Sequence, residues 1–116
     1  MRTSSAKAKG RRLQNAVADA IRARFPDLEP DDVRPAIMGA SGEDVLLSPA
    51  ARKRFPYSVE CKNTERLNVW EALRQAEANC GEHTPLLVFT RNRSKTYVAI
   101  EWSQFLELHG GNDGGS

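Results

Sequence analysis

One short segment, Ser58–Asn63, restricts the fold of this 116-residue chain more than any other stretch. It has the composition of a strand, yet its centre carries two opposite charges, Glu60 and Lys62. Side chains alternate between the two faces of a strand, so both charges project to one side, about 6–7 Å apart. Val59 and Cys61 project to the other side, where we expect the core. Such a charged pair on a buried sheet is costly unless a ligand compensates it, and a metal ion with a phosphate would do so.

A second apolar run lies upstream of this strand and also begins with an acid. It comprises Asp44-Val45-Leu46-Leu47-Ser48, and residues 48–56 connect it to the strand over 57–63. We expect the two runs to form adjacent strands joined by an open loop. The carboxylate of Asp44 would then lie near that of Glu60.

The remaining apolar residues follow the periodicity of helices and strands. Leu13, Val17 and Ile21 recur at the spacing of one helix face, and a continuous apolar run is typical of a central buried strand. In chain order, the predicted elements are a helix over residues 6–25, an edge strand over 33–38, strands over 44–48 and 57–63, a helix over 69–79, strands over 85–90 and 96–100, and a short helix over 102–108. This α-β-β-β-α-β-β-α order predicts an α/β fold with a mixed central β-sheet flanked by helices.

Length and composition indicate one globular domain, which we expect to span residues 1–109. Residues 1–8 are predicted to be a flexible basic arm, and residues 110–116 a disordered glycine-rich tail. The two cysteines, Cys61 and Cys80, lack the spacing of a zinc site, and we expect both to be reduced. The first residues lack the apolar segment of a signal peptide, and no run approaches the ~18 apolar residues of a membrane span. We therefore expect a cytoplasmic protein with no membrane partner.

The basic residues are clustered, although the formal net charge is only +2. One cluster lies at the N-terminus, a second in the loop before the strand over 57–63, and a third in the turn over 91–95. Three basic clusters around one candidate site favour a polyanionic ligand. The candidate nucleic-acid-binding residues are Lys7, Lys9, Arg11, Arg12, Arg34, Arg52, Lys53, Arg54, Arg91, Arg93 and Lys95. For Arg34, a surface salt bridge to Asp31 or Asp32 is an equal alternative.

Asp44, Glu60 and Lys62 together have the residue types of a metal-assisted hydrolase. A hard divalent ion such as Mg²⁺ prefers oxygen ligands, which the two carboxylates and the main-chain carbonyl of Cys61 would supply. A water bound by the ion can attack a phosphate. Lys62 would lie close to that water and to the scissile phosphate, either as the general base or as a stabiliser of developing charge. We therefore expect all three side chains to be catalytic.

These residues resemble the motif of the PD-(D/E)xK nuclease superfamily. Gly42-Glu43-Asp44 is similar to the PD half of that motif, and Glu60-Cys61-Lys62 is similar to its (D/E)xK half. The predicted order of elements over about residues 9–100 resembles the superfamily's core, which is the restriction-endonuclease-like fold. Lys9–Leu13 and Gly39–Gly42 further resemble the basic start of the first helix and the Gly/Ser-rich lead-in of small phage and archaeal nucleases of the Holliday-junction-resolvase type.

The resemblance implies a Mg²⁺-dependent DNA endonuclease, with Mn²⁺ as a substitute ion. It extends to branched, Holliday-junction-like DNA as a substrate and to a homodimer as the assembly that such DNA calls for. Three further residues are implied as accessory to the site. Gln14 stands where resolvases carry a metal-site Glu, Glu43 replaces the superfamily's Pro, and Gln75 matches a polar position on the helix after Lys62. An amide is a poorer metal ligand than a carboxylate, so Gln14 predicts a site that binds fewer ions.

Two other functions are compatible with the same residues. The chain could be a non-catalytic module that binds nucleic acid or protein, or a regulatory subunit of a larger nuclease. Glu-x-Lys also occurs by chance in strands as a solvent-facing pair. The complete set of Asp44, Glu60 and Lys62 favours the enzyme, because a binding module has no need of it.

Overall fold

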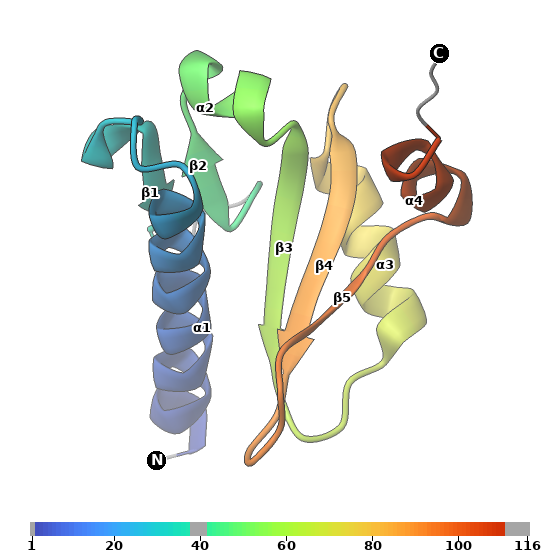
Figure 1. Ribbon diagram of the computed structural model, residues 1–116. Helices are drawn as coiled ribbons and strands as arrows, with labels where there is room; N and C mark the ends of the chain where they lie inside the picture. Colours follow the sequence, from blue (N-terminus) through green and yellow to red (C-terminus); the bar gives the residue numbers. More distant parts are fainter. Residues whose placement is uncertain (1, 38–41, 111–116) are drawn as a thin grey trace.

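The computed structural model describes residues 2–37 and 42–110, with side chains from Ser5 onward. Its elements are α1 (Arg2–Arg24), η1 (Pro30–Asp32), β1 (Val33–Pro35), β2 (Val45–Leu47), α2 (Pro49–Arg54), β3 (Tyr57–Asn63), α3 (Val69–Asn79), β4 (Thr84–Thr90), β5 (Tyr97–Ala99) and α4 (Trp102–Leu108). This arrangement confirms the predicted α/β class, with helices flanking a mixed sheet (Figure 1). The end of the first predicted strand at Met38, the predicted turn at 39–41 and residues 111–116 of the predicted tail lie outside the described residues.

Helix α1 is longer than the sequence indicated, because it begins at Arg2. Residues 2–8, which we expected to be a flexible arm, belong to its first turns. Gly10 does not interrupt the helix, since a helical glycine costs only about 1 kcal/mol relative to alanine and the neighbouring alanines and lysines favour helix. Leu13 and Ile21 are buried, as their spacing predicted. Neither α1 nor any other helix of the described residues is long and apolar enough to cross a membrane.

The strands form two sheets instead of the single mixed sheet that we expected. β1 pairs antiparallel with β2, with Val33 opposite Leu47. β3 pairs parallel with β4, and β4 pairs antiparallel with β5, so the three-stranded sheet is the mixed one. β2 approaches β3 at its start, where the Asp44 N–H donates to the Val59 carbonyl (2.9 Å). The two strands then separate, because Ser48 ends β2 and begins a helix.

Helix α2 occupies the connection over residues 48–56, where we expected an open loop. Ser48 caps the helix, since its Oγ accepts a hydrogen bond from the Ala51 N–H (3.1 Å). Pro49 has the fixed φ that suits the first helical residue. The Ser48 hydroxyl also donates to Asp32 (2.6 Å), which joins α2 to the turn before β1. This Ser-Pro pair is a helix-start signal that the loop prediction overlooked.

Helix α3 connects β3 to β4, behind their sheet in Figure 1. Its bounds are those predicted, and Asn68 caps it by accepting a hydrogen bond from the Glu71 N–H (3.1 Å). Ala72 and Ala76 are its buried residues. The other face of the sheet contributes to the main core, which α1 and both sheets share. Members of this core include Leu13, Ile21, Val33, Val45, Val59, Cys61, Leu86 and Val88.

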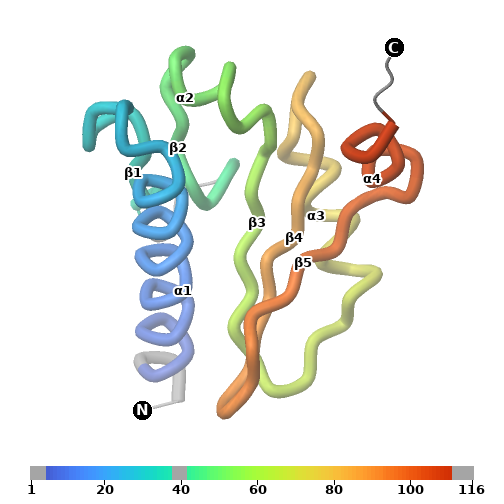
Figure 2. The backbone as a smooth tube through the Cα atoms, viewed as in Figure 1, coloured from blue at the N-terminus to red at the C-terminus, as the bar shows by residue number. Residues whose placement is uncertain are grey.

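The two edges of strand β3 have different neighbours. β4 pairs along one edge, whereas α1 runs beside the other edge (Figure 2). The alternation along β3 is the one predicted, with Val59 and Cys61 in the core cluster. Glu60 and Lys62 lie on the opposite face, where their side chains form an ion pair. The edge of β3 between α1 and β2 is where the candidate site is built.

Candidate active site

Asp44 is fixed against the free edge of β3 by two hydrogen bonds. Its N–H donates to the Val59 carbonyl (2.9 Å), and its Oδ2 accepts from the Cys61 N–H (2.7 Å). The first bond sets the backbone of Asp44, and the second sets its carboxylate. The charge of Asp44 is thereby held next to the centre of the strand that carries Glu60 and Lys62.

Glu60 is buried, at 7% exposure, and has two polar neighbours. The Lys62 Nζ lies 3.5 Å from Glu60 Oε2, and the Asn79 Nδ2 donates to Glu60 Oε1 at 3.5 Å. Asn79 is the last residue of α3, so the crossover helix reaches the site at its C-terminal end. Lys62 is more open than its partner, with 28% of its side chain exposed. The lysine can thus meet a ligand while it holds the glutamate.

Asp44 is close enough to Glu60 to disturb the ionisation of Glu60. Burial raises the pKa of Asp44, although the Cys61 N–H and the charge of Lys62 oppose the change. Burial also raises the pKa of Glu60, and the negative charge of Asp44 raises it further. Burial thus disfavours the charged forms of both carboxyl groups, and a bound cation would offset that cost.

Gln14 of α1 completes this cluster and contains an unsatisfied polar atom. Its side chain is buried, at 7% exposure, and a hydrogen bond from it lowers the pKa of Asp44. A carboxylate only accepts hydrogen bonds, so the Gln14 amide nitrogen is the donor. The carbonyl oxygen, Oε1, is buried with no hydrogen-bond partner. A cation or its bound water would satisfy this buried acceptor beside the Asp44 carboxylate.

The main-chain carbonyl of Cys61 faces the site, whereas its sulfur lies in the core. The N–H and C=O of one strand residue point to the same edge, so the Cys61 carbonyl faces the edge where Asp44 accepts its N–H. Its thiol is buried in the core, and burial, followed by the charges of Asp44 and Glu60, raises the pKa of the thiol. A group that stays protonated is not a thiolate ligand.

These donors fit a hard divalent cation. Within the described residues, no three His, Cys, Asp or Glu side chains come together as metal ligands. The two carboxylates would therefore share an ion with the Cys61 carbonyl and the Gln14 Oε1. Four oxygen donors of this kind suit Mg²⁺ or Mn²⁺, which complete their shells with water, and do not suit a thiophilic metal.

The other two accessory candidates lie differently. Glu43 pairs with Arg52, whose guanidinium also donates to the Tyr57 carbonyl (2.7 Å). This pair links the segment before β2 to α2, and it leaves Glu43 engaged outside the carboxylate cluster. Gln75 lies on α3 with its side chain exposed. The structure therefore brings Asp44, Glu60, Lys62 and Gln14 together and places Gln75 apart from them.

The basic candidates divide into engaged and available side chains. Lys9 pairs with Glu65 (3.4 Å), and Arg54 pairs with Asp27 and lies over the Phe25 ring. Arg52 is held by Glu43, as described above. For the part of the chain that the structure covers, the remaining candidates have exposed side chains and no ion pair, and the alternative bridge from Arg34 to its acidic neighbours is not formed. They are Lys7, Arg11, Arg12, Arg34, Lys53, Arg91, Arg93 and Lys95.

Asn79 is the site residue that the sequence did not reveal. A polar residue on the buried stripe was the available signal, because Asn79 follows Ala72 and Ala76 at the spacing of one helix face. It appeared to be only the end of a helix. Its bond to Glu60 shows that the end of α3 supports the carboxylate.

Comparison with protein families agrees with this geometry. A family model described as "Phage putative PDDEXK endonuclease" matches residues 5–110, nearly the whole chain. Comparisons with curated proteins and with solved structures gave no match. The matched segment contains α1 with Gln14, the Asp44 lead-in and the Glu60-Cys61-Lys62 strand. The chain therefore belongs to this phage family within the PD-(D/E)xK nuclease superfamily.

Proposed function

We propose that this protein is a metal-dependent endonuclease that hydrolyses phosphodiester bonds of DNA, with Mg²⁺ as its cofactor and Mn²⁺ as a substitute. The observation that carries the proposal is the close pair of carboxylates, half-buried Asp44 and buried Glu60, with the unpaired Gln14 oxygen beside Asp44 and the partly exposed Lys62 beside Glu60. The cluster is costly for an unliganded fold, and a cation would relieve the cost. Family membership supports the same activity.

Each side chain has a defined role in this chemistry. Asp44, Glu60, the Cys61 carbonyl and Gln14 Oε1 would hold the ion. When bound, the ion would supply an activated water and neutralise charge on the phosphate. Lys62 donates hydrogen bonds from its partly exposed ammonium group to the attacking water and to a phosphate oxygen. As the water oxygen bonds to phosphorus, its proton passes to solvent, the bond to the leaving sugar oxygen breaks, and that oxygen takes up a proton from solvent. Lys62 stabilises the negative charge that builds on the phosphate.

The available basic side chains would hold the DNA backbone near this site. Asn63, which follows Lys62 on β3, donates from its side chain to the Lys9 carbonyl (3.0 Å). This bond places the basic first half of α1 beside the C-terminal end of β3. Glu65 ties the turn at 91–95 to the same place, because it pairs with Lys9 and accepts the Asn92 N–H. Phosphates bound by Lys7, Arg11, Arg12 and the turn would flank Lys62.

Cleavage of supercoiled plasmid and of a four-way junction tests the proposal. We expect nicking or resolution in Mg²⁺ or Mn²⁺ and none in EDTA. Lys62→Ala should abolish it, whereas Arg74→Ala, which removes an exposed cation on α3, should not. Absence of metal-dependent cutting, or unimpaired cutting by Lys62→Ala, would refute the enzyme. DNA binding without cutting would then favour the non-catalytic module.

Branched DNA is the finer substrate that we propose, and a homodimer is the assembly. The face of the sheet opposite Lys62 holds an apolar groove of about 620 Å³ between α1 and the β5–α4 segment. In and beside the groove, β5 and α4 expose apolar side chains of the kind that a self-complementary two-fold contact would bury. The exposed groups are Val98 (56%), Trp102 (69%), Phe105 (41%), Leu106 (46%) and Leu108 (60%).

The area of this surface suits a second copy of the chain. Given the sizes of such side chains, their exposed parts amount to roughly 500 Å² per chain, compared with ~800 Å² per partner in a standard interface. The lining of the groove from α1 would add to this area. Sedimentation equilibrium should give a dimer for the wild type and a monomer for Phe105→Asp. A monomeric wild type at micromolar concentration would refute the assembly without affecting the cleavage test.

A further inference from the structure

A cavity of about 370 Å³ lies next to the C-terminal end of β3 and is lined in part by Val69, the first residue of α3. Its walls come from two parts of the chain that are distant in sequence. One is the β3–α3 loop with the start of α3, and the other is the end of β4, the turn after it and the start of β5. The lining includes two aromatic side chains, Phe89 and Tyr97, and one guanidinium group, that of Arg91. Its volume falls within the range of small-ligand sites.

The register of the sheet places this cavity next to the candidate catalytic lysine. Lys62 lies opposite Phe89, and Phe89 lies opposite Tyr97. Residues directly opposite each other project to the same face of a sheet. The three side chains thus form a row, in which Phe89 and Tyr97 line the cavity and Lys62 is one strand away, at a spacing of about 4.8 Å.

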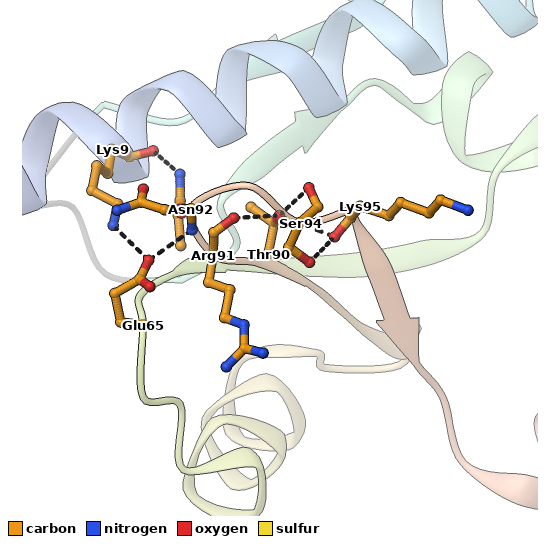
Figure 3. A network of polar contacts seen from close by, with 8 residues as sticks. Lys9, Glu65, Thr90, Arg91, Asn92, Ser94 and Lys95 are labelled. Carbon is orange, nitrogen blue, oxygen red and sulfur yellow. Dashed lines mark hydrogen bonds and ion pairs between the residues drawn. The ribbon is translucent and has the colours of Figure 1, made fainter.

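The cavity combines aromatic rings with an unused cation. The centroids of Phe89 and Tyr97 are 6.2 Å apart, and Tyr97 is 54% exposed, so its ring has a free surface. The Arg91 guanidinium points away from the polar contacts of the turn (Figure 3). Among the described residues it forms neither a hydrogen bond nor an ion pair. Aromatic rings and guanidinium planes are the groups on which proteins stack unpaired nucleobases.

A network of polar contacts holds the wall that carries Arg91 (Figure 3). Glu65 Oε2 accepts the Asn92 N–H (2.7 Å) and pairs with the Lys9 ammonium (3.4 Å). The Asn92 N–H, followed by Lys9, lowers the pKa of Glu65, so this carboxylate stays ionised at neutral pH. The Thr90 hydroxyl lies within hydrogen-bond distance of the Lys95 carbonyl (3.1 Å) across the turn. The cavity is therefore set in shape before a ligand arrives.

We propose that this cavity binds one unpaired nucleobase of the DNA substrate, next to the phosphate that Lys62 would contact. The base stacks on Tyr97, and Arg91 donates to its edge or to the adjoining phosphate. A base inside a duplex would first have to be unpaired and unstacked, so an already unpaired base is favoured. The inference rests on the proposed function and narrows its substrate to DNA with unpaired nucleotides at the cut, such as single strands, flaps and opened junctions.

Abasic scanning of DNA tests the proposal without requiring cleavage. Fluorescein-labelled single-stranded oligonucleotides, each with one abasic nucleotide at a different position, are titrated with the full chain in EDTA, and anisotropy gives the affinity. For the wild type, one abasic position should weaken binding about 5- to 150-fold, the range of a lost base–aromatic stack. Tyr97→Ala should bind more weakly and lose this position dependence, whereas Tyr97→Phe should keep it.

Three control variants make the outcome specific. Arg91→Ala should weaken binding more than Lys95→Ala, although both remove one exposed cation from the same turn. Trp70→Ala removes another exposed aromatic side chain, and its abasic profile should match that of the wild type. An unchanged profile in Tyr97→Ala, or a profile lost in Trp70→Ala, overturns the proposal. Failure to cut plasmid in any metal would count against the proposed function alone, because the affinity measurement needs no cleavage.

Discussion

Replacing Gln14 by Glu should destabilise the metal-free protein and strengthen its response to metal. In the structure, the Gln14 amide donates to Asp44, and its oxygen is buried without a partner. Gln14→Glu removes the donor and places a second negative charge at hydrogen-bond range from Asp44. It also restores the carboxylate that the resolvase resemblance implies at this position.

The magnitude follows from the burial and proximity of the two groups. Like charges about 4 Å apart repel by about 4 kcal/mol at an effective dielectric constant of 20. Loss of a hydrogen bond to a charged group adds about 1.5–3 kcal/mol. Proton uptake by one carboxyl group limits the total. We expect a loss of about 3–4 kcal/mol at pH 7, or roughly 10–15 °C in melting temperature for a domain of this size.

Thermal unfolding in EDTA and in millimolar Mg²⁺ or Mn²⁺ measures both parts of the prediction. The metal should raise the melting temperature of Gln14→Glu more than that of the wild type, because three carboxylates bind a divalent ion more tightly than two. Gln14→Met is the matched control, with similar volume and no charge. In EDTA it should melt between the wild type and Gln14→Glu, because it loses the hydrogen bond to Asp44 without adding a negative charge, and it should respond less to metal. A Gln14→Glu variant as stable as the wild type in EDTA would show that the side chain does not face Asp44 as described.

Three further predictions concern Lys62, the Asp44 carboxylate and the contact between Glu65 and the turn at 91–95. Lys62→Met should slow single-turnover plasmid cleavage at least about 100-fold while the metal-induced rise in melting temperature persists; loss of that rise would assign Lys62 to metal binding instead. In EDTA, the free energy of unfolding of the wild type, from urea titrations, should fall relative to that of Asp44→Asn as pH rises from about 4 to 7. The pKa of Asp44 is raised in the folded chain, so the folded chain retains a proton which the unfolded chain releases. A difference that stays constant with pH would contradict this. Glu65→Ala should speed hydrogen exchange of the Asn92 amide and leave the exchange of the core amides of α1 unchanged. An unchanged exchange rate at Asn92 would mean that its hydrogen bond to Glu65 is not formed in solution.

Periodicity predicted the parts of the fold that depend on local sequence. The alternation of Val59 and Cys61 with Glu60 and Lys62 placed the charges on one face, as the structure confirms. The bounds of α3 followed from its cap at Asn68 and its apolar stripe. Such features depend on residues a few positions apart, so the sequence contains the necessary information.

Features that depend on contacts between distant segments were not predictable in the same way. The division of the sheet depends on where β2 leaves β3, which the capping of α2 by Ser48 decides. The role of Asn79 depends on the end of α3 reaching Glu60. Arg52, expected to contact DNA, pairs with Glu43 instead, which depends on α2 lying against the segment before β2. The proximity of Asp44, Glu60 and Lys62 was predicted from the motif, and their catalytic roles remain predictions.

Strand β5 separates the two surfaces on which the proposals rest. Because side chains alternate along a strand, Tyr97 lies on the face of Lys62 and Val98 on the face of the apolar groove. The proposed base-binding cavity and the proposed dimer contact therefore occupy opposite faces of the same sheet. A second copy could cover Val98 without obstructing Tyr97, so both catalytic faces of a dimer would stay accessible to DNA. A three-residue strand at the edge of the sheet is enough for this separation, because each face needs only one or two side chains from it.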